Sequence, residues 1–413
     1  MTVTLPDPPV VHDELEAHHA EVIRATLPLV GANVDEITTV FYRMLFDNHP
    51  ALLRNLFNRG NQAQGAQQRA LAASIATYAT HLVDPELPHP SELLSRIGHK
   101  HASLGITADQ YGVVYDNLFA AIVEVLGADT VTSDVAAAWD RVYWIMANTL
   151  IALERDLYAA AGVADGDVHR RATVVSRVDD PSGAVLLSVH PVDGVIPDNV
   201  PGQYVSVGVT MPDGARQLRQ YSLVNAPGAD ELVFAVKPVD AAGDAPAGEV
   251  SNWIAANVRV GDLLDITMPF GDLPAPESKD RSTVLISAGV GITPMIGLLE
   301  YFAAQTPDRH VRVLHADRGD KQHPLRERQH ELVAQLPNGS LDVWYEDGLT
   351  GQRDGVHAGR MLLADVSIPA DAEVYLCGSN GFVQAVRAQL TDIGVPADQV
   401  HCELFSPNDW LLG

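Results

Sequence analysis

The spacing of apolar residues changes twice along this chain, and those changes limit what it can fold into. Over residues 1–160 apolar residues recur every three or four positions, which predicts packed amphipathic helices. Over residues 168–273 the period falls to two in short runs such as AVLLSVHPV, which predicts a small antiparallel β-barrel with one helix near VSNWIAANV. Over residues 281–413 apolar strands alternate with helical segments, which predicts a doubly wound α/β domain. We therefore predict three domains with these boundaries.

Charge and cysteine content exclude several classes of protein. The 413 residues carry a net charge of −26, so the surface is expected to repel nucleic acid and anionic lipid. Two cysteines are too few for a disulfide framework or a four-thiolate iron–sulfur cluster. No apolar run reaches the ~20 residues that span a bilayer, and the N-terminus lacks the features of a signal peptide. We expect a cytoplasmic protein without stable membrane association.

Three polar residues interrupt the apolar pattern of the helical region. His101 lies in the apolar stripe of a helix predicted over 91–104, and Glu154 lies in the stripe of the last helix. Tyr111 lies in the first turn of the helix after His101, which begins with a predicted capping box of Thr107 and Gln110. A buried carboxylate needs a partner, and a carboxylate beside an imidazole suits a metal-bound histidine. The alternative is three unrelated core residues, each hydrogen-bonded locally.

Three motifs in the later regions suit nucleotide cofactors. RQYSL (219–223) puts an arginine that can pair with a diphosphate beside an aromatic ring and a hydroxyl, although an ordinary amphipathic strand is an equal reading of these residues alone. GEVSNW (248–253) begins a helix whose first amides can hold a phosphate. GVGITPM (289–295) joins a strand to a helix through glycines that permit close approach, with Thr293 as the predicted N-cap and Pro294 in the first turn; a simple tight turn remains the alternative.

The helical region resembles the globin domain of flavohaemoglobins, the bacterial and fungal nitric oxide dioxygenases. The resemblance rests on FYRMLFDNHPALLRNLFN, QQRALAASIATYA, GHKHASLGITADQY and AWDRVYWIMANTLIALERDLY. It implies that His101 is the proximal haem ligand, with Tyr111 and Glu154 as its hydrogen-bonding partners. It also implies that Tyr42 hydrogen-bonds bound oxygen. It further implies that Gln67 and Leu71 occupy the distal helix and that Phe57 is the phenylalanine that packs against the haem.

The resemblance continues through the rest of the chain. PGQY (201–204) and RQYSL are similar to motifs of ferredoxin-reductase-like flavoproteins, and GVGITPM, YLCGSNGF (375–382) and HCELFSP (401–407) resemble their nicotinamide loops and C-terminal segment. The proline usual in the second loop is replaced here by Ser379 and Asn380. The flavin residues implied are Tyr204, Arg219, Gln220, Tyr221, Ser222, Gly248, Val250, Ser251 and Phe405, the last together with Glu403. The nicotinamide residues implied are Gly289, Gly291, Ile292, Thr293, Pro294, Cys377 and Gly378.

The resemblance implies haem b, FAD and NADH or NADPH as cofactors, and a monomer. Electrons would pass from NAD(P)H through FAD to the haem iron, where nitric oxide and O₂ give nitrate. Tyr42, Tyr111 and Glu154 are the expected catalytic residues. The alternatives are a haem-based oxygen or redox sensor or oxygen-binding module with an attached reductase, and a plain diaphorase or ferric reductase with a haem-free helical region. Asp317 and Arg318 leave the choice of nucleotide open, and the family favours NADH.

Overall fold

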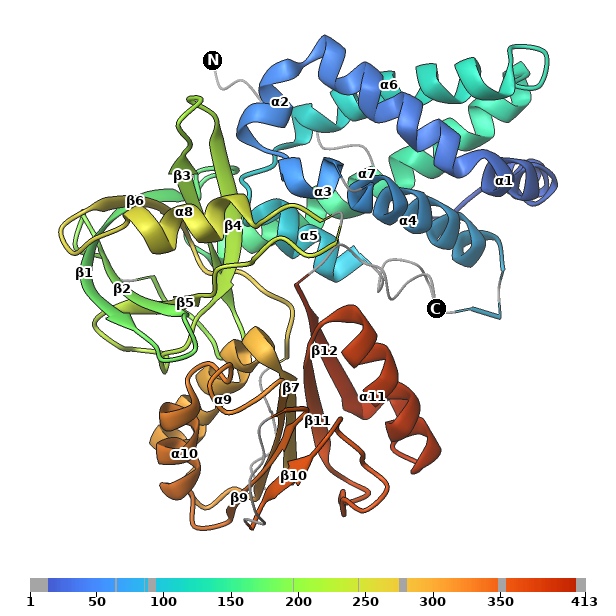
Figure 1. Cartoon of the computed structure of the whole chain (residues 1–413). Helices are drawn as coiled ribbons and strands as arrows, with labels where there is room; N and C mark the ends of the chain where they lie inside the picture. The colour runs from blue at the N-terminus through green and yellow to red at the C-terminus, as the bar shows by residue number, and fades with distance from the viewer. Residues whose placement is uncertain are drawn as a thin grey trace, which may run out of the picture. The chain divides into compact units, whose positions relative to one another are not determined.

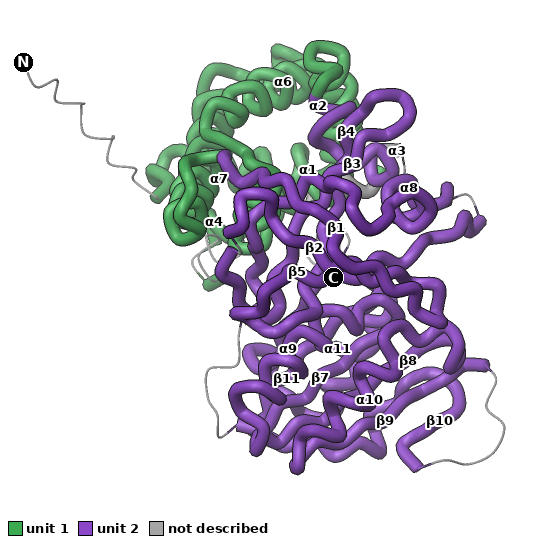
Figure 2. The backbone as a smooth tube through the Cα atoms, turned by 90° about the vertical axis from the view of Figure 1, so that its left-hand side faces the viewer, with its two compact units in different colours: residues 1–51, 65–166 green, residues 52–64, 167–413 purple. Residues whose placement is uncertain are grey.

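A computed structural model of the chain describes residues 14–63, 65–84, 86–87, 94–195, 197–243, 245–274, 281–347 and 354–405. Within this description the chain forms two compact units (Figure 2). One unit takes residues up to 51 and 65–166, and the other takes 52–64 and 167 onward. The predicted fold class, helical first and then antiparallel β and doubly wound α/β, is confirmed. The three predicted domain boundaries stay predictions.

The first unit consists of helices whose apolar faces meet. Its helices are α1 (Ala17–Asn48), α4 (Ala66–Val83), α5 (Ser95–Ala102), α6 (Ala108–Leu126) and α7 (Ser133–Ala160). α1 packs against α4, α6 and α7, and α5 packs against α7. The predicted capping box of Thr107 and Gln110 begins α6. The predicted helix start at Ser91 lies outside the described residues, and α5 begins at Ser95. In the described part of the chain, no helix is long and apolar enough to cross a membrane.

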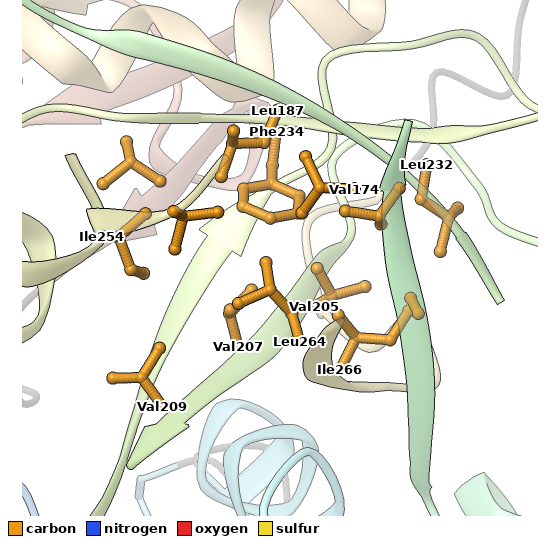
Figure 3. Packing of buried hydrophobic residues seen from close by; sticks show 14 of the residues in the cluster. Val174, Leu187, Val205, Val207, Val209, Leu232, Phe234, Ile254, Leu264 and Ile266 are labelled. Carbon is orange, nitrogen blue, oxygen red and sulfur yellow. The ribbon is translucent and has the colours of Figure 1, made fainter. Parts of the chain in front are cut away.

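The second unit begins with a six-stranded antiparallel sheet. Its strands follow the order β4-β3-β6-β1-β2-β5. They are β1 (His169–Asp179), β2 (Val185–Pro191), β3 (Tyr204–Thr210), β4 (Arg216–Ser222), β5 (Leu232–Val236) and β6 (Leu263–Thr267). An isolated bridge between Leu223 and Phe234 joins the outer strands and partly closes the barrel. Valine, leucine and isoleucine side chains together with Phe234 fill most of its core (Figure 3), and helix α8 (Glu249–Asn257) adds Ile254 to that core.

Residues 52–64 belong to this second unit although they lie between helices of the first in sequence. They include the end of α2 (Pro50–Asn55) and α3 (Arg59–Ala63). Figure 2 draws them in the colour of the second unit, with α3 beside β3, β4 and α8.

The rest of the second unit is a parallel sheet in the order β10-β9-β8-β7-β11-β12. Its strands are β7 (Thr283–Ala288), β8 (Val311–Asp317), β9 (Gly339–Tyr345), β10 (Val356–Ala358), β11 (Glu373–Gly378) and β12 (Val400–Leu404). α9 (Ile292–Gln305) and α10 (Arg326–Ala334) cover one face, and α11 (Asn380–Asp392) covers the other (Figure 1). The two edge strands β10 and β12 were not predicted, because they are short and carry few consecutive apolar residues.

Candidate functional site

Three helices bring His101, Tyr111 and Glu154 together. The imidazole Nδ1 of His101 lies 2.9 Å from Glu154 Oε1 and 3.0 Å from the Tyr111 hydroxyl, which itself donates to Glu154 Oε1. The Glu154 side chain is 3% exposed, whereas that of His101 is 33% exposed. Burial, reinforced by the Glu154 carboxylate, raises the pKa of Tyr111 well above its usual range, so the phenol keeps its proton and donates it. The predicted three-residue set therefore exists as one hydrogen-bonded network.

This network fixes the tautomer of His101. An ionised carboxylate only accepts hydrogen bonds, so Nδ1 carries the proton that is directed at Glu154. The lone pair of a neutral imidazole is then on Nε2, the atom that faces away from the network. A carboxylate bonded in this way orients the ring and makes it a stronger ligand. The arrangement suits a histidine that would bind a metal ion through Nε2.

Gly98 allows α5 to approach α7 closely, and the sequence analysis missed it. A Cβ atom at Gly98 would collide with the side chain of Leu153, lying 3.0 Å from its Cγ and closer still to its Cδ2. Gly98 is one turn before His101, and Leu153 is next to Glu154. The missing side chain thus lets the imidazole reach the carboxylate.

Gly98→Ala is expected to lower the free energy of unfolding of the helical unit by about 1–3 kcal/mol, because the added methyl overpacks the α5–α7 contact. Thermal unfolding followed by far-ultraviolet circular dichroism measures this loss. The matched control is Gly112→Ala in α6, where a Cβ meets nothing within 4 Å and where alanine should stabilise the helix by about 0.5–1 kcal/mol. Equal behaviour of the two variants would contradict the close-approach role of Gly98.

The structure places the residues predicted for the distal side on elements other than the three helices that carry the His101 network. Tyr42 is buried on α1, and its ring lies 4.7 Å from that of Phe41 and 5.6 Å from that of Phe46, centroid to centroid. Leu71 is partly buried on α4, the helix that also carries the backbone of Gln67; the Gln67 side chain lies outside the description. Phe57 belongs to the segment grouped with the second unit. The roles predicted for these residues stay predictions.

The RQYSL strand presents an arginine and a tyrosine for which the described residues supply, respectively, no carboxylate hydrogen-bond partner and no partner for the side-chain hydroxyl. The Arg219 guanidinium donates to the carbonyl of Leu218 at 2.7 Å and contacts Gln217 Oε1 at 3.4 Å, so no carboxylate is among the partners described for it. Burial lowers its pKa. The hydroxyl of Tyr221 is buried and finds no hydrogen-bond partner in the described residues, and its ring stacks on Phe234. Among the described residues, this guanidinium has only neutral hydrogen-bond partners and the neighbouring phenol has none, which fits an anionic ligand with a polar aromatic ring.

The other residues predicted to bind flavin lie on strands β3 and β4 and on helix α8. Tyr204 and Ser222 are both buried and are register partners across β3 and β4, and Gln220 donates to Ser206 at 2.8 Å. Val250 and Ser251 lie in the first turn of α8, where amides have no partner within the helix. Gly248 differs from its predicted role, because its amide already donates to the Val239 carbonyl at 2.9 Å.

The two predicted nicotinamide loops meet at the carboxyl ends of adjacent strands. A Cβ atom at Gly291 would lie 2.6 Å from the Cys377 carbonyl oxygen, so the loop after β7 touches the carboxyl end of β11. Gly289 adopts a φ of +54°, and Gly378 is the last residue of β11. The prediction that Thr293 caps α9 is wrong. A short 3₁₀ turn over Gly289–Gly291 precedes the helix, which begins at Ile292, and the Thr293 hydroxyl instead donates to the Val290 carbonyl.

The remaining residues predicted near the nicotinamide lie in or beside these two loops and at the end of the described chain. Pro294 lies in the first turn of α9 as predicted, and Cys377 is fully buried. Ser379, which stands in the loop that usually carries proline, caps α11 by accepting from the Phe382 amide at 3.4 Å. Phe405 is half-exposed at the end of the described chain.

Gly297 lets helix α9 approach the residue that follows strand β4, and this glycine was not predicted from the sequence either. A Cβ atom at Gly297 would lie 2.6 Å from the carbonyl oxygen of Leu223. Leu223 directly follows Ser222, and Gly297 lies one turn beyond Thr293. The end of the RQYSL strand and helix α9, which follows the GVG loop, are therefore in contact within the second unit.

Comparison with known proteins agrees with this geometry. Residues 285–388 match the family described as Oxidoreductase NAD-binding domain. The flavohemoprotein of Chromobacterium violaceum is 39% identical over 93% of this chain and 96% of its own. The structure of flavohemoglobin from Malassezia yamatoensis with bound FAD and heme aligns with a TM-score of 0.85 and 35% identity, covering 95% of this chain and all of that one. The FAD/NAD-binding domain of nitric oxide dioxygenase from Vibrio cholerae covers 58% of this chain and all of that one, at 36% identity and a TM-score of 0.54. The chain therefore belongs to the flavohemoprotein family.

Proposed function

We propose that this protein is a nitric oxide dioxygenase that uses haem, FAD and NADH or NADPH to convert nitric oxide and O₂ to nitrate. Its family and its NAD-binding domain make it an oxidoreductase. The observation that supports the finer assignment is the His101–Tyr111–Glu154 network, which a simple oxygen carrier would not need. A relative in Vibrio cholerae is named a nitric oxide dioxygenase.

The residues present fit both prosthetic groups. His101 offers Nε2 to iron, while Glu154 holds the ring and increases its donor strength. Arg219 and the first-turn amides of α8 offer positive charge and donors to the FAD diphosphate. The Tyr221 hydroxyl, for which the described residues supply no hydrogen-bond partner, would offer a polar contact to the flavin.

The residues that we assign to the nicotinamide and to FAD both belong to the second unit, which supports electron transfer from the nicotinamide to FAD. FAD accepts two electrons as hydride and releases them singly, which links a nicotinamide to iron. Gly291 lets the GVG loop approach the end of β11, and Gly297 lets α9 approach the end of the RQYSL strand, so the segments that we assign to nicotinamide and to flavin lie on neighbouring elements of one unit. Conversion of nitric oxide and O₂ to nitrate requires one electron for each nitric oxide, so one nicotinamide supports two turnovers.

Tyr42→Phe tests the proposed distal donor. We assign the buried Tyr42 hydroxyl as a hydrogen-bond donor to the diatomic substrate, and a bond of this kind to a partly charged atom contributes about 1.5–3 kcal/mol. The variant is therefore expected to retain haem and to lose O₂ at least about tenfold faster, measured by stopped-flow after mixing with an O₂ scavenger. An unchanged rate would refute the assignment.

The proposed activity is tested directly with a nitric oxide electrode. Pure haem-loaded and FAD-loaded protein is expected to consume nitric oxide in the presence of O₂ and NADH, with nitrate as product. The control is His101→Ala protein at the same FAD concentration. Nitric oxide consumption no faster than that of the control would refute the proposal. Tight, reversible O₂ binding with negligible turnover would identify an oxygen-binding module instead.

A further inference from the structure

The segment that carries Phe57 is tied to the flavin strand by one buried side chain. Gln217 of β4 is 1% exposed. Its amide nitrogen lies 3.4 Å from the carbonyl oxygen of Leu53, 3.0 Å from that of Arg54 and 3.3 Å from that of Phe57. Because these carbonyls turn toward a single donor group, the backbone around Phe57 has its position fixed by strand β4.

The other end of the same amide reaches the proposed diphosphate site. Gln217 Oε1 lies 3.4 Å from the backbone amide of Arg59 and 3.4 Å from Nη1 of Arg219. One carboxamide therefore contacts both the Phe57 segment and the guanidinium that we assign to FAD.

A charge network joins the two regions a second time. Arg59 binds Glu249 through Nε at 3.3 Å and also through Nη2, and it binds Asp213 of the β3–β4 hairpin at 2.5 Å. Glu249 is the first residue of α8, next to the amides that we assign to the FAD phosphate. An ionised carboxylate at that position repels a phosphate, and its pairing with Arg59 removes most of that repulsion. Burial lowers the pKa of Arg219, and the nearby Glu249 carboxylate and Arg59 guanidinium act on that pKa in opposite directions, so Arg219 experiences both charges.

We propose that Arg59 and Gln217 are positioning residues that couple FAD binding to docking of residues 52–59, the segment that carries Phe57. The proposal rests on the flavin site of the proposed function. When the segment is docked, Glu249 is neutralised and Arg219 is oriented, so FAD binds more tightly. By linkage, bound FAD holds the segment more firmly in return.

The first test measures the Kd for FAD by fluorescence quenching. Arg59→Met is expected to weaken FAD binding by about tenfold, within the 5–150-fold range of typical coupling. Glu249→Gln in the Arg59→Met background is expected to restore most of the affinity, because it removes the unpaired carboxylate. The matched control is Arg43→Met, which breaks an exposed 2.7 Å pair with Glu124 in the other unit and should leave the Kd unchanged. Wild-type affinity in Arg59→Met, or no restoration in the double variant, would overturn the proposal.

The second test measures amide hydrogen exchange in residues 52–59 of the full-length protein with and without FAD. FAD is expected to slow exchange there in the wild type but not in Gln217→Met. Arg59→Met, whose side chain is partly exposed, gives the same comparison if the buried Gln217 variant fails to fold. Exchange that is insensitive to FAD in the wild type would contradict the coupling. Neither readout involves nitric oxide, so these failures leave the dioxygenase proposal standing, whereas a wild-type protein that binds no FAD would overturn both.

Discussion

Protein that carries His101→Ala is expected to purify with FAD and without haem. The structure gives His101 a single orientation, since Nδ1 is held by Glu154 at 2.9 Å, and Nε2 is the atom left to coordinate iron. Loss of even a hydrogen-bonding partner of a metal ligand typically lowers metal affinity 10–100-fold, so loss of the ligand itself should lower haem affinity by at least ~100-fold. The measurement is the Soret absorbance relative to flavin content, before and after gel filtration with added haemin.

Two variants make this result specific. His99→Ala removes an imidazole from the same helix, two residues away and on another face, and should retain the Soret band. His101→Gly with free imidazole should recover haem binding, because the small ligand replaces the missing ring. A normal Soret band in His101→Ala, or equal loss in His99→Ala, would show that iron is held elsewhere.

The His101–Tyr111–Glu154 network was predictable because two of its residues interrupt regular apolar stripes of helices. His101 and Glu154 each stand where helical spacing calls for an apolar residue, and burial forces such groups to find partners. The partners then proved to be each other and Tyr111. Strand and helix order in the nucleotide region was predictable for a similar reason, since the apolar periods there are long and alternate regularly.

The residues that set close approaches could not be predicted. Gly98 and Gly297 each look like a weak position in a helical pattern, and nothing local shows that Leu153 or the Leu223 carbonyl occupies the space beside them. Gln217 looks like an ordinary polar residue of an alternating strand. Its partners lie about 160 positions earlier in the chain, so only the tertiary fold reveals its role. Thr293 was misassigned as a cap because a 3₁₀ turn over the preceding glycines moves the start of α9.

Arg219→Met is expected to abolish FAD retention while haem binding persists. The guanidinium has neutral oxygen partners on Leu218 and Gln217 and no carboxylate among its described contacts, so its charge is available to the diphosphate. A charge-assisted hydrogen bond contributes about 1.5–3 kcal/mol, and loss of two such bonds from one guanidinium should weaken FAD binding by at least ~100-fold.

Arg216→Met is the matched control for that measurement, because it removes the same charge from the same strand. Arg216 pairs with Asp265 at 3.3 Å and contacts His169 at 3.1 Å, so its charge is already compensated within the sheet. Its loss should change the Kd for FAD little, whereas Arg219→Met should release FAD on dialysis and leave the Soret band of the haem unit intact. If the two variants bound FAD equally well, the diphosphate would have to be held by the first turn of α8 alone, and Arg219 would serve only the strand that carries it.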